Sequence, residues 1–437
     1  MLLVLLALCA VFSIVTYTEQ QPTGAAAAKL LAADIAGHFG KGARVLIASR
    51  DQPEDSEFAD SLRTELSAAG ATVLDVVKGE PRDARAALDK IATSGGKLDA
   101  IACNQTTASW LVFADLKTRF PALGDPRVVQ PRPYKWPNFL KSDNLLNIAN
   151  QIAVIAIIAI GMTVVIITGG IDLSVGSLIA LSAVLAAMFI RDHAGGIAAT
   201  AFGMTLCCIV GMLAAGLVGG VSGGMITAFQ IPPFIVTLAM MLVASGASYL
   251  LAKGQSVYQV PDSFVWLGRG ADLHGIPNAV VLMLALYGLA HAMMSRTVLG
   301  RYIYAVGGNR EAARLSGVPV RRVLMFAYVL CGALAGLGGV VMASQLKSGS
   351  PTYGQMYELY VIAAVVVGGT SLSGGEGNMF GTLIGAFTIA VIQNGMNLCG
   401  IESYTQKVVL GLVILLAVLF DMLKKRIWRR VFGGSRS

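Results

Sequence analysis

Charged residues are scarce in this chain of 437 residues. They make up 13% of the sequence, whereas hydrophobic residues make up 55% and the mean hydropathy is +0.68. Soluble domains carry charge on about a quarter of their residues, so these values exclude an ordinary soluble protein. Acidic residues are scarcest after the first third, because sixteen of the 25 lie between Thr18 and Asn144. The sequence therefore predicts a polar insert near the N-terminus and an α-helical polytopic membrane body.

The chain also lacks the residue patterns of metal sites, disulfide frameworks and enzymes. Its six cysteines have no metal-ligand spacing, and the insert holds only Cys103, which excludes a disulfide within it. The segment Gly37–Gly42 (GHFGKG) lacks the spacing and the hydroxyl residue of a phosphate-binding loop. We therefore predict a chain that is not an enzyme, with no catalytic residue, metal or cofactor. The net charge of +8 is interpreted as membrane topology, not as a nucleic-acid surface.

Apolar runs predict about ten transmembrane helices. The first, Leu2–Val15, lacks the basic start and cleavage site of a signal peptide, so we expect an uncleaved anchor. The other spans are expected at about 145–169, 172–191, 198–219, 232–252, 276–295, 322–344, 357–372, 376–398 and 405–422.

Arginine and lysine crowd the loop 296–322 and the tail, and such clusters remain in the cytoplasm. This predicts a multi-pass membrane protein with both termini in the cytoplasm and the insert outside. The expected parts, in chain order, are an anchor helix at 1–18, an extracytoplasmic domain at 19–137, a membrane domain at 138–422 with a cytoplasmic loop at 296–322, and a basic tail at 423–437.

The insert alternates strand and helix patterns, which favours an α/β domain with a parallel sheet. Strands are expected at Ala43–Ser49, Ala71–Val77 and Leu98–Cys103, and helices at Asp55–Ala69, Asp83–Thr93 and Thr106–Phe120. About 100 residues are enough for a hydrophobic core of its own.

The stretch Ile160–Ser177 reads IGMTVVIITGGIDLSVGS and has one carboxylate, Asp172. A charge at membrane depth usually faces protein or water. The glycines beside it favour a broken helix, which membranes tolerate where the backbone lines a cavity or is buried. The stretch therefore fits a transport pathway, or a short loop in which Asp172 caps the second helix.

The stretch Glu358–Gly377 (ELYVIAAVVVGGTSLSGGEG) repeats this order of carboxylate, apolar half-helix and glycine-rich break. Two interrupted helices in different parts of a bundle are typical of transporters with a site near the midplane. A third segment, Asn309–Gly317, favours a short cytoplasmic helix that Asn309 caps and Gly317 ends. It suits docking into a partner's groove, or it is a basic loop that only fixes orientation.

Five motifs in order resemble those of the permease subunits of bacterial ABC importers for monosaccharides, the branch that includes the ribose permease. They are GGIDLSVGS (169–177), IPPFIVTLAMM (231–241), AVGGNREAARLSGV (305–318), AAVVVGGTSLSGG (363–375) and NGMNLCGI with KVVLGLVILLAVLFD (394–421). The resemblance runs from about Pro137 to Arg426.

The resemblance implies a subunit that moves a ribose-type sugar or a related small polar solute across the inner membrane. It implies a cytoplasmic ATPase subunit that binds ATP and Mg, a second permease copy or paralogue, and a periplasmic sugar-binding protein, with membrane lipid around the spans. It also implies that the segment 309–317 is the coupling helix that docks on the ATPase. The residues expected to act in coupling are Asn309, Glu311, Ala312, Ala313, Arg314 and Gly317. For the solute pathway we expect Asp172, Ser174, Glu358, Gln393, Asn394 and Asn397, although Asn394 can instead bridge helices.

The chain departs from the family pattern at Tyr360, where an aspartate is common, and at Glu376, where a basic residue is common. The insert is unusual for the family and resembles one lobe of a ribose-type sugar-binding protein. Asn104 and Gln105 would then supply half a site or dock a partner, unless the insert is only a cap. Two alternatives stay open for the whole chain: an ion-coupled secondary transporter that uses Asp172 or Glu358, and a membrane sensor with an outer ligand-binding lobe.

Overall fold

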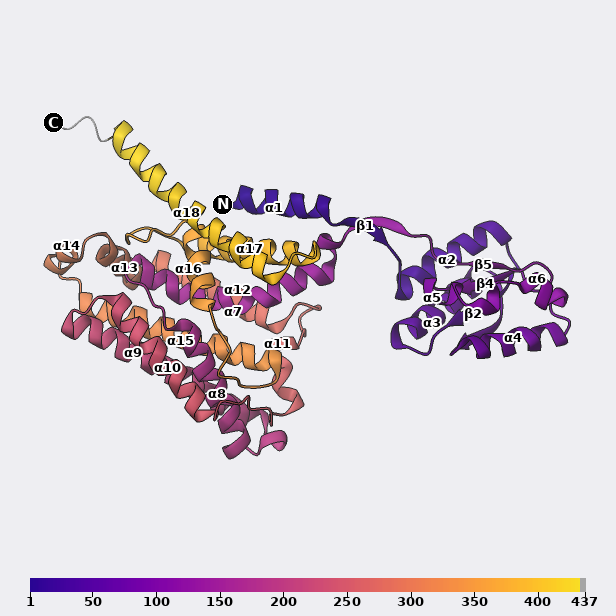
Figure 1. Ribbon diagram of the computed structural model, residues 1–437, viewed down its shortest axis with the longest axis horizontal. Helices are drawn as coiled ribbons and strands as arrows, with labels where there is room; N and C mark the ends of the chain where they lie inside the picture. The colour runs from indigo at the N-terminus through magenta and orange to yellow at the C-terminus, as the bar shows by residue number, and fades with distance from the viewer. Residues whose placement is uncertain (433–437) are drawn as a thin grey trace. The chain divides into compact units, whose positions relative to one another are not determined.

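The computed structural model describes residues 1–432, so the end of the predicted basic tail lies outside the described residues. Its contacts divide the chain into two compact units (Figure 1). One unit is Tyr17–Pro137, and the other joins Met1–Thr16 to the chain from Asn138 onward. The second unit is helical.

The helical unit contains seven helices that are long and apolar enough to cross a membrane. They are α7 (Ser142–Ile167), α8 (Val175–His193), α9 (Ala201–Phe229), α10 (Pro233–Leu251), α12 (Asn278–Arg296), α15 (Val320–Leu346) and α17 (Met379–Leu398). Three further helices have shorter apolar stretches: α1 (Leu2–Val15), α16 (Tyr357–Val367) and α18 (Ser403–Phe432). The remaining helices of this unit are α11 (Trp266–Arg269), α13 (Val298–Gly308) and α14 (Arg310–Leu315).

Each of the nine apolar segments predicted after the insert contains one of these helices. Several boundaries differ from the prediction. Helix α9 runs to Phe229, ten residues beyond the expected end at 219, and α18 runs to Phe432, ten residues beyond the expected end at 422. Helix α16 ends at Val367, five residues before the expected end, because the glycine-rich stretch that follows leaves the helical conformation. The connection 296–322 contains the expected short helix as α14, together with α13, which the sequence analysis did not predict. Thr297 caps α13 by accepting from Gly300 N–H, and Ile303 and Val306 on α13 are buried.

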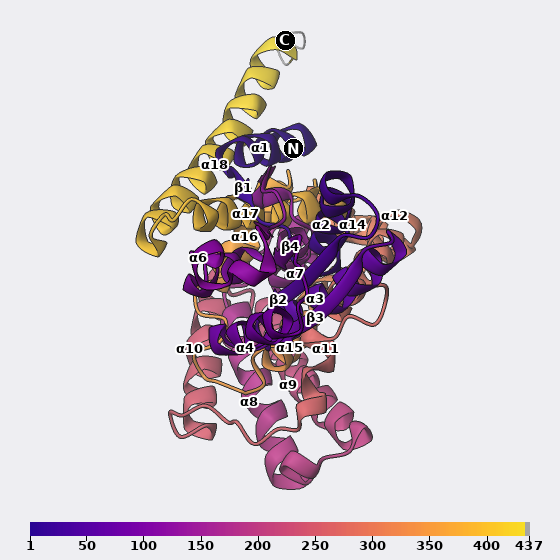
Figure 2. The ribbon, with the colours of Figure 1, turned by 90° about the vertical axis from the view of Figure 1, so that its right-hand side faces the viewer.

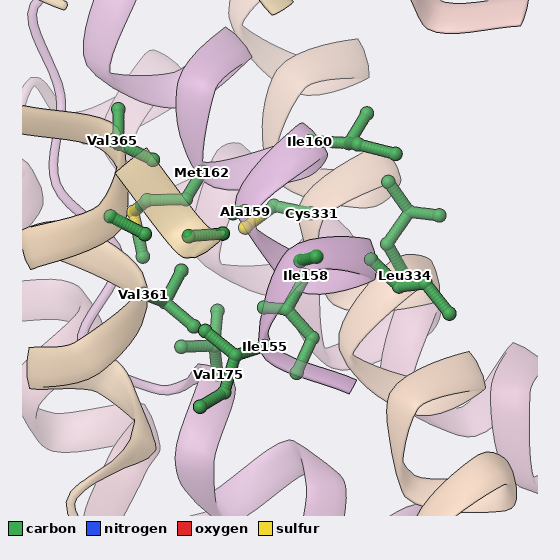
Figure 3. Close-up of a cluster of buried hydrophobic side chains, with 14 of the residues drawn as sticks. Ile155, Ile158, Ala159, Ile160, Met162, Val175, Cys331, Leu334, Val361 and Val365 are labelled. Carbon is green, nitrogen blue, oxygen red and sulfur yellow. The ribbon is translucent and has the colours of Figure 1, made fainter. Parts of the chain in front are cut away.

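Helix α7 is the centre of the helical unit. Every residue from Ile152 to Ile167 is buried, and α7 packs against α12, α13, α15, α16 and α17. Figure 3 shows its isoleucines among Cys331 and Leu334 of α15 and Val361 and Val365 of α16. A helix that is apolar on all sides is expected to be enclosed. Helices α9 and α10 instead leave several leucines exposed.

Glycines allow α9 and α15 to approach closely. A Cβ atom at Gly332 would lie 2.5 Å from the carbonyl oxygen of Ala215, and one at Gly219 would lie 2.3 Å from that of Tyr328. Small residues at such spacing are the usual contact between membrane helices. Gly332 of α15 and Gly219 of α9 therefore form a helix-packing contact.

Tyr17–Pro137 folds around a four-stranded parallel sheet in the order β3-β2-β4-β5. The strands are β2 (Arg44–Ser49), β3 (Thr72–Lys78), β4 (Ala100–Cys103) and β5 (Arg127–Val129), and the helices are α2 (Gly24–Phe39), α3 (Pro53–Ala68), α4 (Pro81–Thr93), α5 (Gln105–Ala108) and α6 (Leu116–Arg119). A separate antiparallel ribbon of β1 (Tyr17–Gln20) and β6 (Tyr134–Pro137) joins the two ends of the unit.

The sheet has a hydrophobic core on each face. Val45 and Ile47 of β2 pack with α2 and α3, whereas Leu46 and Ala48 pack with α4 and the segment before β5. Figure 2 turns this unit toward the viewer, with α3 and α4 beside the strands. The alternation follows from the two-residue period of a strand.

The helix predicted at Thr106–Phe120 is wrong as a single element. The chain forms α5, a 3-10 turn at Leu111–Phe113 and α6 instead. The break falls at Trp110, whose extended backbone lets its ring stack on Phe113 at 6.0 Å between centroids. The prediction also missed α2 and β5.

We predict that Gly332→Ala lowers the thermal stability of the purified protein, because the added methyl meets the backbone of α9. Overpacking by one methyl costs about 1–3 kcal/mol. The measurement is the melting temperature of the whole chain in detergent. Gly288→Ala on α12 is the matched control, since no atom lies within 4 Å of its new Cβ. An equal loss in both variants would contradict this account of the contact.

Candidate solute pathway and coupling segment

The connection between α7 and α8 holds the carboxylate of Asp172. Its Oδ1 accepts hydrogen bonds from the backbone N–H of Ser174 at 2.9 Å and from the Ser174 hydroxyl at 2.6 Å. Both residues are fully buried, and neither lines the two polar cavities described below. The bond to the residue two positions on forms an Asx turn that precedes α8, whose N-cap, Ser174, makes no side-chain capping hydrogen bond; the alternative interpretation, that Asp172 caps α8, is therefore not confirmed. Solute contact by Asp172 or Ser174 stays a prediction.

Two buried polar atoms near this connection have no hydrogen-bond partner within residues 1–432. They are Asp172 Oδ2 and the hydroxyl of Tyr328 on α15. Tyr328 lies against Gly170, where a Cβ atom would be 2.3 Å from the hydroxyl oxygen. An unpaired buried polar group costs about 1–3 kcal/mol.

A cavity of about 290 Å³ lies beside the start of α16. Glu358 lines it from the first turn of α16, where the helix dipole favours a negative charge. The ion pairs among the described side chains do not include Glu358. The other polar side chains of the cavity are Ser177, Ser245, Tyr353 and Gln355. Met241 and Leu242, at the middle of α10, also line the cavity, so the cavity lies level with the middle of that helix.

A second polar cavity, of about 270 Å³, lies beside Tyr357 and Tyr360 of the same helix. Gln151, Gln345 and Gln393 supply its amide groups. Tyr360, the position at which the chain departs from the family pattern, therefore still brings a hydroxyl to this cavity. The start of α16 thus contributes Glu358 to one cavity and two tyrosines to the other.

The remaining predicted pathway residues connect helices. Asn394 on α17 exchanges two hydrogen bonds with Asn144 on α7, at 2.9 and 3.1 Å. Asn397 accepts a hydrogen bond from Gln406 on α18 at 2.7 Å. Neither asparagine lines the two polar cavities. Of the predicted set, Glu358 and Gln393 are the residues that the structure places at a polar cavity.

Sequence reasoning missed the cavity residues that surround Glu358. Ser177 lies within the quoted motif, but its position was not assigned a role. The segment Gly349–Gly354 (GSPTYG) precedes Glu358, and its glycines and proline are the signal of a second break in the chain. Ser245 lies in the interior of α10 and has no local signal at all.

The segment predicted to act in coupling forms α14. Asn309 caps it by accepting from Ala312 N–H at 3.0 Å, and Gly317 follows it with a φ of +82°, a conformation that favours glycine. Glu311 and Arg314 form an ion pair at 2.9 Å on the exposed side. Ala313 is buried against the protein, whereas Ala312 is exposed. The segment therefore presents a short polar face that is free for contact.

The sequence family that matches this chain is described as "Branched-chain amino acid transport system / permease component", and the match covers residues 144–418. The chain belongs to this permease family. The match begins after the Tyr17–Pro137 unit and includes both polar cavities and α14.

Three sugar permeases are similar in sequence to this chain. The chain is 44% identical to the ribose import permease protein of Escherichia coli K12 over 66% of this chain and 88% of that protein. It is 43% identical to the ribose import permease protein of Bacillus subtilis, over 66% of this chain and 87% of that protein. It is 35% identical to the L-arabinose ABC transporter permease protein of Azospirillum brasilense, over 66% and 83%. No solved structure matches the chain.

We predict that Gly176→Ala reduces transport by the permease. A Cβ atom at Gly176 would lie 2.3 Å from Glu358 Oε2 and 2.5 Å from the carbonyl oxygen of Gly354. Since this overpacking costs about 1–3 kcal/mol, solute uptake into proteoliposomes should fall about tenfold. Gly246→Ala, beside the cavity residue Ser245, is the control, because its new Cβ has no atom within 4 Å. Unchanged uptake by Gly176→Ala would contradict the role of this cavity.

Proposed function

We propose that this chain is the transmembrane subunit of an ATP-driven importer and that it carries a ribose-type monosaccharide or a related small polar solute. The observation that supports the proposal is the pair of polar cavities at the start of α16 in a chain of this permease family. Serine, tyrosine and glutamine side chains donate and accept hydrogen bonds, as sugar hydroxyls require. The named relatives are ribose and L-arabinose permeases.

The proposal includes ten spans, with α1, α16 and α18 added to the seven long helices. A 14-residue helix such as α1 is about 21 Å long, shorter than the roughly 30 Å hydrocarbon core. Its packing against α17 supports its place in the membrane, since Phe12 fills the space left open at Gly395. Ten spans place both termini and α14 in the cytoplasm and the Tyr17–Pro137 unit outside, in accord with the basic residues around α14.

The proposal assigns ATP hydrolysis to a separate cytoplasmic subunit that docks on α14. A second permease subunit would cover part of the apolar faces of α9 and α10, and an external sugar-binding protein would deliver the solute. In this arrangement the chain supplies the path and the coupling contact, and it performs no covalent chemistry itself.

Uptake of a panel of labelled sugars by the permease reconstituted with its ATPase tests the proposal. We expect ATP-dependent, vanadate-sensitive uptake of at least one pentose or hexose. Uptake that follows an ion gradient without ATP would favour the ion-coupled transporter instead. Ligand binding without uptake would favour the sensor. ATP turnover with no movement of any sugar would refute the substrate assignment.

We predict that the double replacement Glu311→Ala and Arg314→Ala uncouples hydrolysis from uptake, because it removes the exposed ion pair of α14. Coupling between sites is worth about 1–3 kcal/mol, so uptake per ATP hydrolysed should fall by roughly tenfold. Arg321→Ala is the control, since Arg321 is equally exposed but lies outside α14. Normal uptake in the double variant would rule out α14 as the coupling helix.

A further inference from the structure

Three glycine-containing segments meet at the end of α7. The N–H of Gly375 donates to the carbonyl oxygen of Ile167 at 2.8 Å. A Cβ atom at Gly307, near the end of α13, would lie 1.7 Å from that same oxygen and 2.6 Å from Gly375 N. One at Gly374 would lie 2.9 Å from the carbonyl oxygen of Gly307. The backbones of the three segments are therefore in direct contact, which any side chain would prevent.

Two side chains extend this contact from the coupling region. Arg310, the first residue of α14, donates from Nη2 to the carbonyl oxygen of Thr168 at 3.2 Å. Tyr304 on α13 donates from its hydroxyl to the carbonyl oxygen of Gly377 at 2.7 Å. The Arg310 guanidinium lies at the C-terminus of α7. A positive charge there satisfies a helix carbonyl and interacts favourably with the dipole of that helix. The docking helix is thus hydrogen-bonded to the end of α7.

Both contacted segments lead to the cavity of Glu358. Thr168 precedes the connection to α8, whose first turns carry Gly176 and Ser177 of the cavity. Gly375 and Gly377 follow α16, whose first turn carries Glu358. A movement of α14 would therefore reach the cavity along two routes, through the α7–α8 connection and through the segment after α16.

We propose that Arg310 is the positioning residue through which displacement of α14 moves the α7–α8 connection and opens or closes the Glu358 cavity. The inference rests on the proposed coupling role of α14. It gives Arg310 a task distinct from that of Glu311 and Arg314, since the Arg310 guanidinium donates to the end of α7, whereas Glu311 and Arg314 pair with each other on the exposed side. Asp172 Oδ2, a buried oxygen without a hydrogen-bond partner among the described residues, lies in the connection that would move.

The test measures ATP hydrolysis and the accessibility of the cavity in the whole reconstituted complex. Ser177→Cys reports accessibility by its rate of reaction with a water-soluble maleimide, compared with the parent chain to subtract the native cysteines. With Arg310 present we expect this rate to change at least about fivefold between the nucleotide-free and the vanadate-trapped states. With Arg310→Ala we expect hydrolysis to continue while the change in rate is lost.

Arg310→Lys should restore part of the change, because an ammonium group can still donate to Thr168, and Arg321→Ala should leave it intact. An undiminished change in Arg310→Ala would overturn the inference, as would a loss in Arg321→Ala of the same size. The outcome is separable from the proposed substrate, because the labelling needs no sugar. If no sugar is transported but the labelling still depends on Arg310, the substrate assignment alone fails.

Discussion

The membrane body depends on satisfying the backbone groups at the end of α7, where a helix stops among buried residues. The last carbonyls of a buried helix need donors from the protein in place of water. Here each one has a protein donor: Thr168 N–H serves Val164, Gly170 N–H serves Val165, and Gly169 N–H serves Ile166. The carbonyls of Ile167 and Thr168 are served from distant segments, by Gly375 and Arg310. Ending this helix therefore forces α8, α14 and the segment after α16 together.

The two buried or partly buried carboxylates, Asp172 and Glu358, lie in different surroundings. Asp172 is enclosed, and its Oδ1 accepts two hydrogen bonds from Ser174 in the turn that leads into α8. Glu358 stands at the N-terminus of a half-helix beside a cavity, where its charge is favoured by the dipole. Gly176 lies between them in the first turn of α8, where a side chain would meet Glu358.

The Tyr17–Pro137 unit follows a different principle. Its parallel sheet is covered on both faces and has a hydrophobic core on each of them. The sequence family begins after it, at residue 144. The chain thus joins a body that matches the family to an α/β unit that lies outside the match.

Local sequence determined the helices, the strands and the three regions of interest, because apolar run length, strand period and glycine breaks are properties of short stretches. The sequence also identified Asn309 and Gly317 as the ends of α14. Which polar residues share a cavity was decided only by the tertiary structure. Gln393 lines a cavity while Asn394, one residue later, binds α7, since successive residues of a helix point about 100° apart. The role proposed for Arg310 likewise depends on the tertiary structure, because folding places its guanidinium beside Thr168, which lies 142 residues earlier in the chain.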